Sequence, residues 1–392
     1  MDRSNDILIP SGTRWLNDPN AQAVCAAIQA GGFDIYFVGG CVRNALLGQP
    51  ESDVDMSTNA VPEMVLILAR DAGLRAIPTG MDHGTITVVA GGSAFEITTF
   101  RRDVATDGRR AVVAFSDDIV DDAKRRDFTM NALYATPDGR VVDPLGGLPD
   151  LLSQRVRFIE NPSARIQEDY LRILRFFRFS AHYAAFNQGF DADTLAEIAD
   201  NMAGLETLSA ERVGQEIRKL LAAVDPAPAV AAMRQIGVLT AILPGSDDQW
   251  LGPLIHLEGA CNISADWRTR LAVLGGQDVV DRLRLSRVDA RRHALCADIG
   301  FVGPSLVEVA YRHGADIAQQ VLLMRYAFAG EMPDLSLLET ISDASRAHFP
   351  IAATDLMPAY QGPALGARLT ALERRWIDSG FKLTRDDLLN GP

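Results

Sequence analysis

The sequence has few cysteines and no long apolar run, and both absences narrow the class of protein. Its four cysteines are scattered without a C-x-x-C pair, which argues against a zinc site and fits a reducing cytoplasm. No stretch of about 18 apolar residues occurs, so we expect no membrane span. The first 15 residues lack the apolar core of a secretory signal, so we expect a cytoplasmic location.

Lysine is nearly absent, and positive charge as a whole is in the minority. The chain has 38 basic against 51 acidic residues, a net charge of −13, and only three of the basic residues are lysines. This bias fits either the composition of the source or selection for guanidinium groups, which bind phosphate in a forked geometry. Because phosphate contacts need positive charge, any nucleic-acid surface on so acidic a chain must be a local patch. Segment 155–178 offers one, with six arginines against three acidic residues: Arg155, Arg157, Arg165, Arg172, Arg175 and Arg178.

Length and hydropathy pattern predict more than one domain. With 392 residues the chain is too long for one typical core. Short β-branched and aromatic runs predict strands in the first 150 residues, mixed with helix, whereas later apolar residues recur at helical spacing. The predicted strands lie at 35–38, 54–57, 85–90 and 95–100, and the predicted helices include 62–73, 165–184 and 211–223, with a linker at 225–229 and a break near 358–366.

Two glycines after the first predicted strand form a possible phosphate-binding turn. Gly39 and Gly40 lead into a helix that begins near Cys41. A helix N-terminus offers free N–H groups to an anion, and glycine lets the backbone approach closely. Arg43, in the first helical turn, could reach the same anion. The Walker pattern is absent, however, and a simple tight turn would also explain the glycines.

Three carboxylates stand in strand-like surroundings near this turn. Residues i and i+2 of a strand point to one face, so Asp53 and Asp55 could hold divalent cations together. Two such ions activate an attacking hydroxyl and stabilise a leaving pyrophosphate. Surface strands often carry such a pair without function. Glu96, in an otherwise apolar run, is either a third carboxylate of this site or a residue on the solvated face of an edge strand.

Two further charged clusters follow. Arg125, Arg126 and Asp127 form a run that usually marks a solvated surface. Asp169 and Arg172, with Arg175, are spaced by three residues, which predicts one side of a helix. A carboxylate acceptor beside a guanidinium donor could imitate the edge of a complementary base. An ordinary surface ion pair has the same spacing, and the phenylalanines between these residues are predicted to be core.

The order and spacing of these motifs resemble the class II tRNA nucleotidyltransferase and bacterial poly(A) polymerase family. The similarity lies in VGGCVRNALLG, DVDMST, HGTITV, FEITTFRRD, RRDFTMNAL, DPLGGLPDL and EDYLRILRFFRF, and covers roughly residues 30–220. It implies an α+β fold, with a small mixed-sheet nucleotidyltransferase head followed by an all-α neck, body and tail. The implied boundaries are a catalytic head at 1–147, a helical neck at 148–229 and an RNA-binding body and tail at 230–392.

The resemblance also implies roles for the head residues. Mg²⁺ would be held by Asp53 and Asp55, with Glu96 as the third catalytic carboxylate. The Gly39–Gly40 turn and Arg43 would contact the triphosphate. The stretch 102–115 would be a flexible loop used in the switch from C to A addition.

In the neck, the resemblance implies recognition of the nucleotide. Arg126 and Asp127 would lie near the ribose and favour a ribonucleotide. Asp169 and Arg172 would hydrogen-bond the base of CTP or ATP. Arg175 and Arg178 would assist at the base, and Glu168 would hold Asp169 and Arg172 in place. Glu211 and Arg212 would brace the neck helices.

Two departures from the family pattern bear on function. Arg43 is followed by Asn44, where the family usually has aspartate, so any ion pair made by that carboxylate is lost. The basic run that family poly(A) polymerases carry before the third-carboxylate strand is also absent, and His83-Gly84-Thr85 stands there instead. This favours addition of CMP and AMP to tRNA lacking all or part of its 3′ CCA over poly(A) synthesis, the alternative.

Other activities fit the same motifs. An enzyme that adds only CC, or only the terminal A, would carry the same motifs. A non-catalytic RNA-binding relative is also conceivable, but it could lose Asp53 and Asp55 freely, and both are present.

Overall fold

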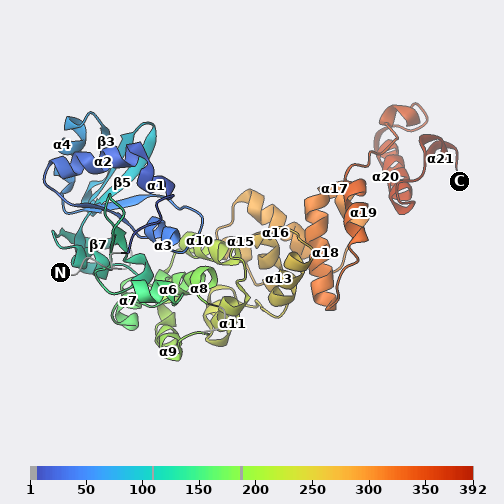
Figure 1. Cartoon of the computed structure of the whole chain (residues 1–392). Helices are drawn as coiled ribbons and strands as arrows, with labels where there is room; N and C mark the ends of the chain where they lie inside the picture. Colours follow the sequence, from blue (N-terminus) through green and yellow to red (C-terminus); the bar gives the residue numbers. More distant parts are fainter. Residues whose placement is uncertain (1–6, 108–109, 186–188, 392) are drawn as a thin grey trace. The chain divides into compact units, whose positions relative to one another are not determined.

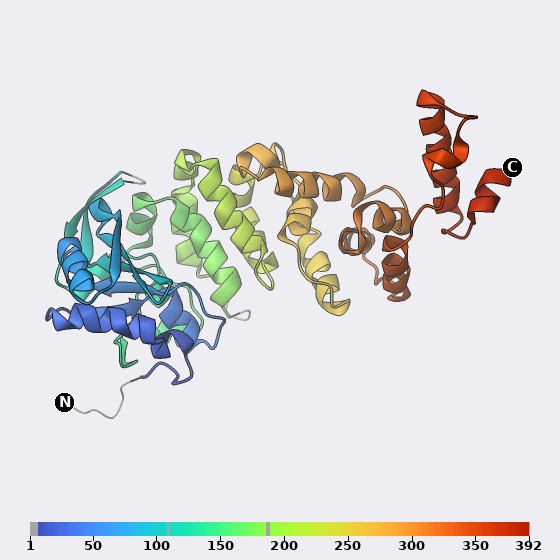
Figure 2. The same ribbon diagram turned by 90° about the horizontal axis from the view of Figure 1, so that it is seen from above.

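The computed structural model describes residues 7–107, 110–185 and 189–391, and these form two compact units. The first ends at Ser209 and the second begins at Ala210. In Figure 2 the ribbon from blue to green carries the sheet, and the ribbon from yellow to red carries helices. A mixed-sheet head followed by many helices is the predicted fold class, which is thereby confirmed. The finer boundaries at residues 147 and 229 stay predictions.

A seven-stranded sheet forms the centre of the first unit. Its strand order is β3-β4-β5-β2-β1-β8-β9, and only β2 and β5 pair in parallel. The four predicted strands correspond to β1, β2, β4 and β5. The bounds are β1 Ile35–Val38, β2 Asp55–Thr58, β3 Arg75–Gly80, β4 Thr85–Ala90, β5 Ser93–Thr99, β8 Tyr134–Ala135 and β9 Val141–Val142.

One face of this sheet is buried and the other is partly open. Alternation along the strands places Phe37, Met56, Ile86 and Ile97 on the buried face, each at most 1% exposed. The helices α2 (Pro19–Ala30) and α4 (Pro62–Asp71) pack against the sheet on that side (Figure 1). Helix α4 confirms the predicted helix at 62–73. Along each strand, the residues that alternate with these point to the opposite, partly open face.

The stretch predicted as a flexible loop at 102–115 has a different form. Strands β6 (Arg101–Asp107) and β7 (Arg110–Phe115) pair antiparallel in a separate two-stranded sheet. Residues 108–109 lie outside the described part of the chain.

The helices of the first unit include one correction to the prediction at 165–184. That segment is two helices, because Asp169 is extended, at φ −155° and ψ 104°, and its Oδ1 accepts a hydrogen bond from Leu171 N. Aspartate competes in this way with helix continuation. Asp169 therefore precedes the helix that carries Arg172 and Arg175 and does not share its face. The bounds are α1 Arg14–Asn17, α3 Gly40–Leu46, α5 Ile119–Lys124, α6 Leu148–Leu152, α7 Pro162–Glu168, α8 Leu171–Tyr183 and α9 Ala192–Asp200.

The second unit is helical over its described residues. Helix α10 follows Ser209, carries Glu211 in its first turn, and buries the predicted apolar stripe that includes Val213 and Ile217. The predicted linker is short because α11 already begins at Ala227. The bounds are α10 Ala210–Leu221, α11 Ala227–Gln235, α12 Val238–Ile242, α13 Leu251–Ala260, α14 Trp267–Leu274, α15 Val279–Arg282, α16 Arg287–Ile299, α17 Leu306–His313, α18 Ala315–Ala329, α19 Ser336–Ser345, α20 Gly362–Asp378 and α21 Arg385–Asn390. None of the described helices is long and apolar enough to cross a membrane.

A buried arginine organises the centre of the second unit. Arg270, 1% exposed, donates to the carbonyl oxygens of Leu221, Ala223 and Val224 at 2.7, 2.5 and 3.2 Å, and pairs with Glu258 at 2.6 Å. The last carbonyl groups of a helix have no partner inside the helix. Arg270 thus supplies hydrogen-bond donors to the carbonyl groups at the end of α10 and just after it.

Candidate functional site

Two carboxylates lie opposite each other where β2 pairs with β5. Asp55, the first residue of β2, is the register partner of Glu96, and both are exposed on the partly open face of the sheet. Glu96 is solvated, but β5 lies between β4 and β2, so the alternative of an edge strand is wrong. Asp53 stands two residues before β2 and does not lie on the strand as predicted. The cluster is therefore assembled by sheet register and by the segment leading into β2.

The pKa of Asp55 is raised above its usual value. Partial desolvation is the largest cause, the negative charge of Glu96 adds to it, Arg126 opposes it, and Asp53 raises it further. Like charges that repel one another favour a bound cation. Over the described ranges, no three His, Cys, Asp or Glu side chains stand close enough to hold a metal alone. The carboxylates fit Mg²⁺, which takes one or two protein carboxylates and completes its shell with phosphate and water.

The glycine turn lies directly beside these carboxylates. Val38, the last residue of β1, is the register partner of Asp55, and Gly39 follows it at φ +73°. A Cβ on Gly39 would lie 3.4 Å from Arg126 Nη1, and one on Gly40 would lie 2.9 Å from Ser52 Oγ. The positive φ of Gly39 favours glycine there, and a side chain at Gly40 would require the hydroxyl of Ser52 to move. The N-terminus of α3 thus opens next to the acidic cluster.

Arg43 is buried beneath this turn. Its Nε and Nη2 donate to Asn44 Oδ1 at 3.1 and 2.9 Å, and its Nη1 donates to Asn131 Oδ1 at 2.5 Å. Nη2 also donates to the hydroxyl of Tyr183 at 2.7 Å. Asn44 in turn donates from Nδ2 to the carbonyl of Pro50 at 2.8 Å. The amide of Asn44 keeps the acceptor that the family aspartate would supply, without its charge.

Arg126 is held near the same turn by Asp122, a carboxylate that the sequence analysis did not single out. Asp122, fully buried, accepts from Arg126 Nη2 at 3.0 Å, from Arg125 Nε at 2.7 Å and from the hydroxyl of Tyr134 at 2.7 Å. Burial alone would raise the pKa of Asp122, but Arg126 and Arg125 hold it far below its usual range. The run Arg125–Asp127 is therefore not a solvated surface.

Asp127 is buried and fully engaged with protein groups. One of its oxygens accepts from Arg175 Nε and Nη2 at 2.7 and 2.5 Å, and the other accepts from Asn131 Nδ2 and Phe128 N at 2.9 and 2.8 Å. Burial opposes ionisation, but Arg175 and these hydrogen bonds lower the pKa of Asp127. Four donors saturate a carboxylate. Asp127 therefore anchors α8 to the segment after α5.

Glu168 holds two arginines at the junction of α7 and α8. Its carboxylate pairs with Arg165 through one oxygen and with Arg172 Nη1 through the other, the latter at 2.6 Å. Arg172 also donates to the carbonyls of Arg165 at 2.8 Å and Arg125 at 3.0 Å. The guanidinium of Arg172 is thus fixed relative to the end of α5.

The phenylalanines between these arginines are core residues, as predicted. Phe176, Phe177 and Phe179 are each at most 4% exposed. The guanidinium of Arg178 lies over Phe179, with 4.3 Å from Cζ to the ring centroid. The rings therefore support the arginines and offer no free stacking surface.

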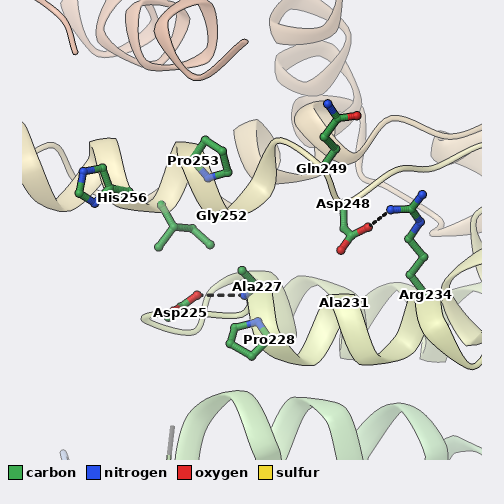
Figure 3. A pocket seen from close by; sticks show the side chains of 11 residues that line it. Asp225, Ala227, Pro228, Ala231, Arg234, Asp248, Gln249, Gly252, Pro253 and His256 are labelled. Carbon is green, nitrogen blue, oxygen red and sulfur yellow. Dashed lines mark hydrogen bonds and ion pairs between the residues drawn. The ribbon is translucent and has the colours of Figure 1, made fainter. Parts of the chain in front are cut away.

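A separate hollow of about 640 Å³ lies between α11 and α13 in the second unit (Figure 3). Arg234 at one end of it pairs with Asp248 at 2.7 Å. The hollow contains none of the predicted site residues. Its lining is Asp225, Ala227, Pro228, Ala231, Arg234, Asp248, Gln249, Gly252, Pro253, Ile255 and His256.

Comparison with known proteins identifies the family. Residues 35–157 match the family described as "Poly A polymerase head domain", and residues 189–249 match "Probable RNA and SrmB- binding site of polymerase A". The chain is 33% identical to the mouse (Mus musculus) protein "CCA tRNA nucleotidyltransferase 1, mitochondrial", over 91% of this chain and 86% of that protein. It belongs to the CCA-adding enzyme and poly(A) polymerase family.

Further similarities agree with this membership. The "CCA-adding enzyme" of Streptococcus gordonii is 36% identical, over 71% of this nucleotidyltransferase and 70% of that protein. The structure described as "Crystal structure of Bacillus stearothermophilus CCA-adding enzyme in complex with CTP" superposes with a TM-score of 0.71 at 26% identity, covering 92% of each chain. The chain is therefore a nucleotidyltransferase of this fold.

Several residues of this nucleotidyltransferase site escaped the sequence analysis. Asp122 and Tyr183 both contact predicted site arginines, and Asn131 links Arg43 to Asp127. The i, i+3 and i, i+4 spacing of Asp122 to the arginine pair was a readable signal of pairing. Nothing in the local sequence of Tyr183 marks it, because its partner lies far away along the chain.

Proposed function

We propose that this nucleotidyltransferase rebuilds the CCA end of tRNA. It transfers CMP and then AMP from CTP and ATP to tRNA lacking all or part of its 3′ CCA, and releases pyrophosphate. The observation that carries the proposal is the position of Asp55 and Glu96 beside the Gly39–Gly40 turn. Relatives spanning most of the chain, named for CCA addition, support the choice of reaction.

In this proposal the head holds the triphosphate and a divalent cation. Asp53 and Asp55 hold Mg²⁺, and Glu96 completes the acidic cluster. When bound, Mg²⁺ activates the attacking hydroxyl and stabilises the leaving pyrophosphate. The N–H groups of the first turn of α3, beginning with Gly40, bind phosphate oxygens. The N–H of Gly39 already donates to the carbonyl oxygen of Leu133 at 3.1 Å, so Gly39 contributes by letting the phosphate approach closely. The guanidinium groups of Arg43 and Arg126 stand beside this turn.

The ribose and the base lie toward α8. Arg126 contacts the ribose side, and Asp127 acts by holding Arg175 in place. Asp169 accepts a hydrogen bond from the amino group of cytosine or adenine, and Arg172 donates to the ring nitrogen beside it. Arg175 and Arg178 assist. Glu168 supports this role because its pairing keeps Arg172 in one orientation.

Poly(A) synthesis is the competing activity within the family. The absence of the basic run before β4 and the names of the relatives favour CCA addition. We propose a cytoplasmic location, and the mitochondrial name of the mouse relative makes the compartment a separate question.

The test is direct. Purified enzyme is given tRNA without its 3′ CCA, Mg²⁺ and each nucleotide singly or together, and the products are sequenced. The proposal expects CCA from the mixture, and CMP but no AMP on tRNA ending at the discriminator base. A run of A on any RNA end would indicate poly(A) polymerase, and incorporation of neither nucleotide would refute the proposal.

A further inference from the structure

Tyr183, the last residue of α8, contacts the guanidinium of Arg43 in α3. Its hydroxyl accepts a hydrogen bond from Arg43 Nη2 at 2.7 Å, and its ring centroid lies 4.1 Å from Arg43 Cζ. Phe179, one turn earlier in α8, adds a second ring at 5.2 Å. Helix α3 begins at the glycine turn, whereas α8 carries the arginines assigned to the base. This contact therefore joins the two halves of the proposed site.

The acceptors around Arg43 are all neutral. They are the side-chain oxygens of Asn44, Asn131 and Tyr183, and among the described residues no ion pair of Arg43 is found. Burial lowers the pKa of Arg43, and this is the largest effect on it. The next largest effect is that of Tyr183, which raises this pKa. Aromatic faces and hydroxyl oxygens hold a cation without cancelling its charge. The positive charge beneath the glycine turn is thus kept for a ligand.

The hydrogen-bond count shows how closely Arg43 is oriented. A guanidinium has five N–H hydrogens, and within the described ranges four hydrogen bonds from Arg43 are present, one from Nε, one from Nη1 and two from Nη2. The remaining hydrogen is on Nη1. Its direction is set by the other four bonds, and Tyr183 is the partner among them that comes from α8.

We propose that Tyr183 is a positioning residue for nucleotide binding. It orients Arg43 under the Gly39–Gly40 turn and ties this turn to α8. The hydroxyl of Tyr183 and the amide of Asn44 together replace the carboxylate that the family usually carries after this arginine. The inference rests on the proposed function, since the ligand it positions for is the triphosphate of CTP or ATP.

The experiment measures steady-state kinetics of CMP and AMP addition by Tyr183→Phe. This variant keeps the ring and removes only the hydroxyl. We expect KM for both nucleotides to rise about tenfold or more, as for loss of one hydrogen bond to a charged group, with kcat within about twofold. The preference for CTP and ATP over UTP and GTP stays unchanged, because the triphosphate is common to all four. The melting temperature should fall slightly, because the buried guanidinium of Arg43 loses one acceptor.

A rescue variant separates positioning from simple stabilisation. Asn44→Asp in the Tyr183→Phe background restores a charged acceptor to Arg43, and such hydrogen bonds are about twice as strong as neutral ones. KM should therefore return toward the wild-type value. Tyr360→Phe is the matched control, since it removes the hydroxyl of a tyrosine in the second unit whose ring lies near Arg368, and it should change neither KM nor kcat.

Two results would overturn the role of Tyr183. One is an unchanged KM in Tyr183→Phe, and the other is a double variant that regains thermal stability but not KM. A wild-type enzyme that adds neither CMP nor AMP would instead overturn the proposed function itself, so the two failures are distinguishable.

Discussion

At the scale of single residues, the carboxylates of the first unit divide into two groups. The buried ones, Asp122, Asp127 and Asp150, are each held by arginine. For Asp53 and Asp55, by contrast, the described residues supply no ion pair. A protein rarely gathers acidic side chains without ion pairs unless a ligand supplies the charge. The absence of a partner at Asp55 is therefore the residue-level sign of a cation site.

Removing one of these charges should separate catalysis from stability. We expect Asp55→Asn to lower the rate of nucleotide addition by at least about 100-fold, because a metal ligand is lost. The melting temperature should stay level or rise slightly, since repulsion from Glu96 and Asp53 is relieved. Steady-state assays and thermal unfolding of the same preparation measure both. Glu63→Gln, an exposed acid in α4, is the control, and a rate above about a tenth of wild type for Asp55→Asn would refute the metal assignment.

In the proposed function, base selection depends on Asp169 and Arg172. Uracil and guanine present a carbonyl to the carboxylate and a ring N–H to the guanidinium, and each unpaired polar group costs about 1–3 kcal/mol. Asp169→Ala should therefore lose most discrimination against UTP and GTP while it still releases pyrophosphate. Arg172→Ala should do the same, although it also frees Glu168 and the carbonyl of Arg125.

Incorporation of all four nucleotides on tRNA ending in the discriminator base measures this selectivity. Arg165→Ala, which removes the other arginine on Glu168, is the matched control for loss of the ion pair alone. An equal loss of rate for every nucleotide, with selectivity kept, would mean that Asp169 and Arg172 are structural only.

At the scale of helices and strands, the end of α10 depends on one side chain. Arg270→Met would leave Glu258 buried without a partner and three carbonyl groups without a donor. Breaking a buried pair in this way costs about 3–5 kcal/mol of the free energy of unfolding. Urea unfolding of the variant measures the loss.

The double variant Arg270→Met/Glu258→Gln isolates the charge. It should recover part of the loss, because no unpaired charge remains, but not the part due to the carbonyl groups of Leu221, Ala223 and Val224. Equal stability of the single and double variants would show that the ion pair itself contributes nothing.

The elements that could be predicted from sequence are those specified by local pattern. Alternating β-branched runs located β1, β2, β4 and β5, and Pro62 with Gly73 bounded α4. The break at Asp169 could not be predicted, because the apolar spacing continues across it and only the side chain's bond to Leu171 N interrupts the helix. The strand pairing of β6 with β7 was missed because the resemblance implied a loop.

The candidate site divides in the same way. The motifs located the glycine turn, the carboxylates and the arginines of α8, because each is a short run with a recognisable spacing. The burial of Arg43 depends on Tyr183, and the full set of hydrogen bonds to Asp127 depends on Arg175. Both partners come from distant segments of the chain. Sequence spacing carries no information on such long-range pairing.

At the scale of the whole molecule, segment 155–178 presents less positive charge to solvent than its six arginines suggest. Arg155 and Arg157 share the buried carboxylate of Asp150, with their side chains 58% and 50% exposed. Arg165 and Arg172 share Glu168, and Arg175 pairs with Asp127. The outward-facing positive charge of segment 155–178 therefore comes mainly from the pair on Asp150.

We expect tRNA binding to be strongly salt dependent despite the net charge of −13, because its contacts come from such local pairs. Arg155→Gln and Arg157→Gln, made singly, should each weaken binding and reduce the slope of log affinity against log salt by roughly one. Single changes leave Asp150 with one arginine, so the fold is kept. Arg75→Gln on β3 is the control. Affinity that stays flat between low and physiological salt would contradict this prediction.

The second unit should lose stability on mild acidification. His293 in α16 is 7% exposed, and burial lowers its pKa, opposed by a hydrogen bond with the Arg268 backbone. The unfolded chain binds this proton at about pH 6.5, more readily than the folded protein does, so the free energy of unfolding falls as pH drops below that value. Chemical unfolding at pH 8, 7, 6 and 5 measures the slope.

The matched variant His293→Leu should flatten that slope between pH 7 and 5 and run parallel to the wild type between pH 7 and 8. A wild-type stability that is constant from pH 8 to 5 would show that His293 does not set the response.

The parallel pairing of β2 with β5 also determines when the acidic cluster comes into being. Neighbouring antiparallel strands can join through a short turn, but parallel partners must wait for the chain between them to cross over. Here that crossover contains α4, β3 and β4. Contacts between such distant segments form late in folding, after the entropy of closing the intervening loop has been overcome. We therefore expect Asp55 to meet Glu96 only after α4, β3 and β4 have been placed, so that a head without them lacks the acidic cluster.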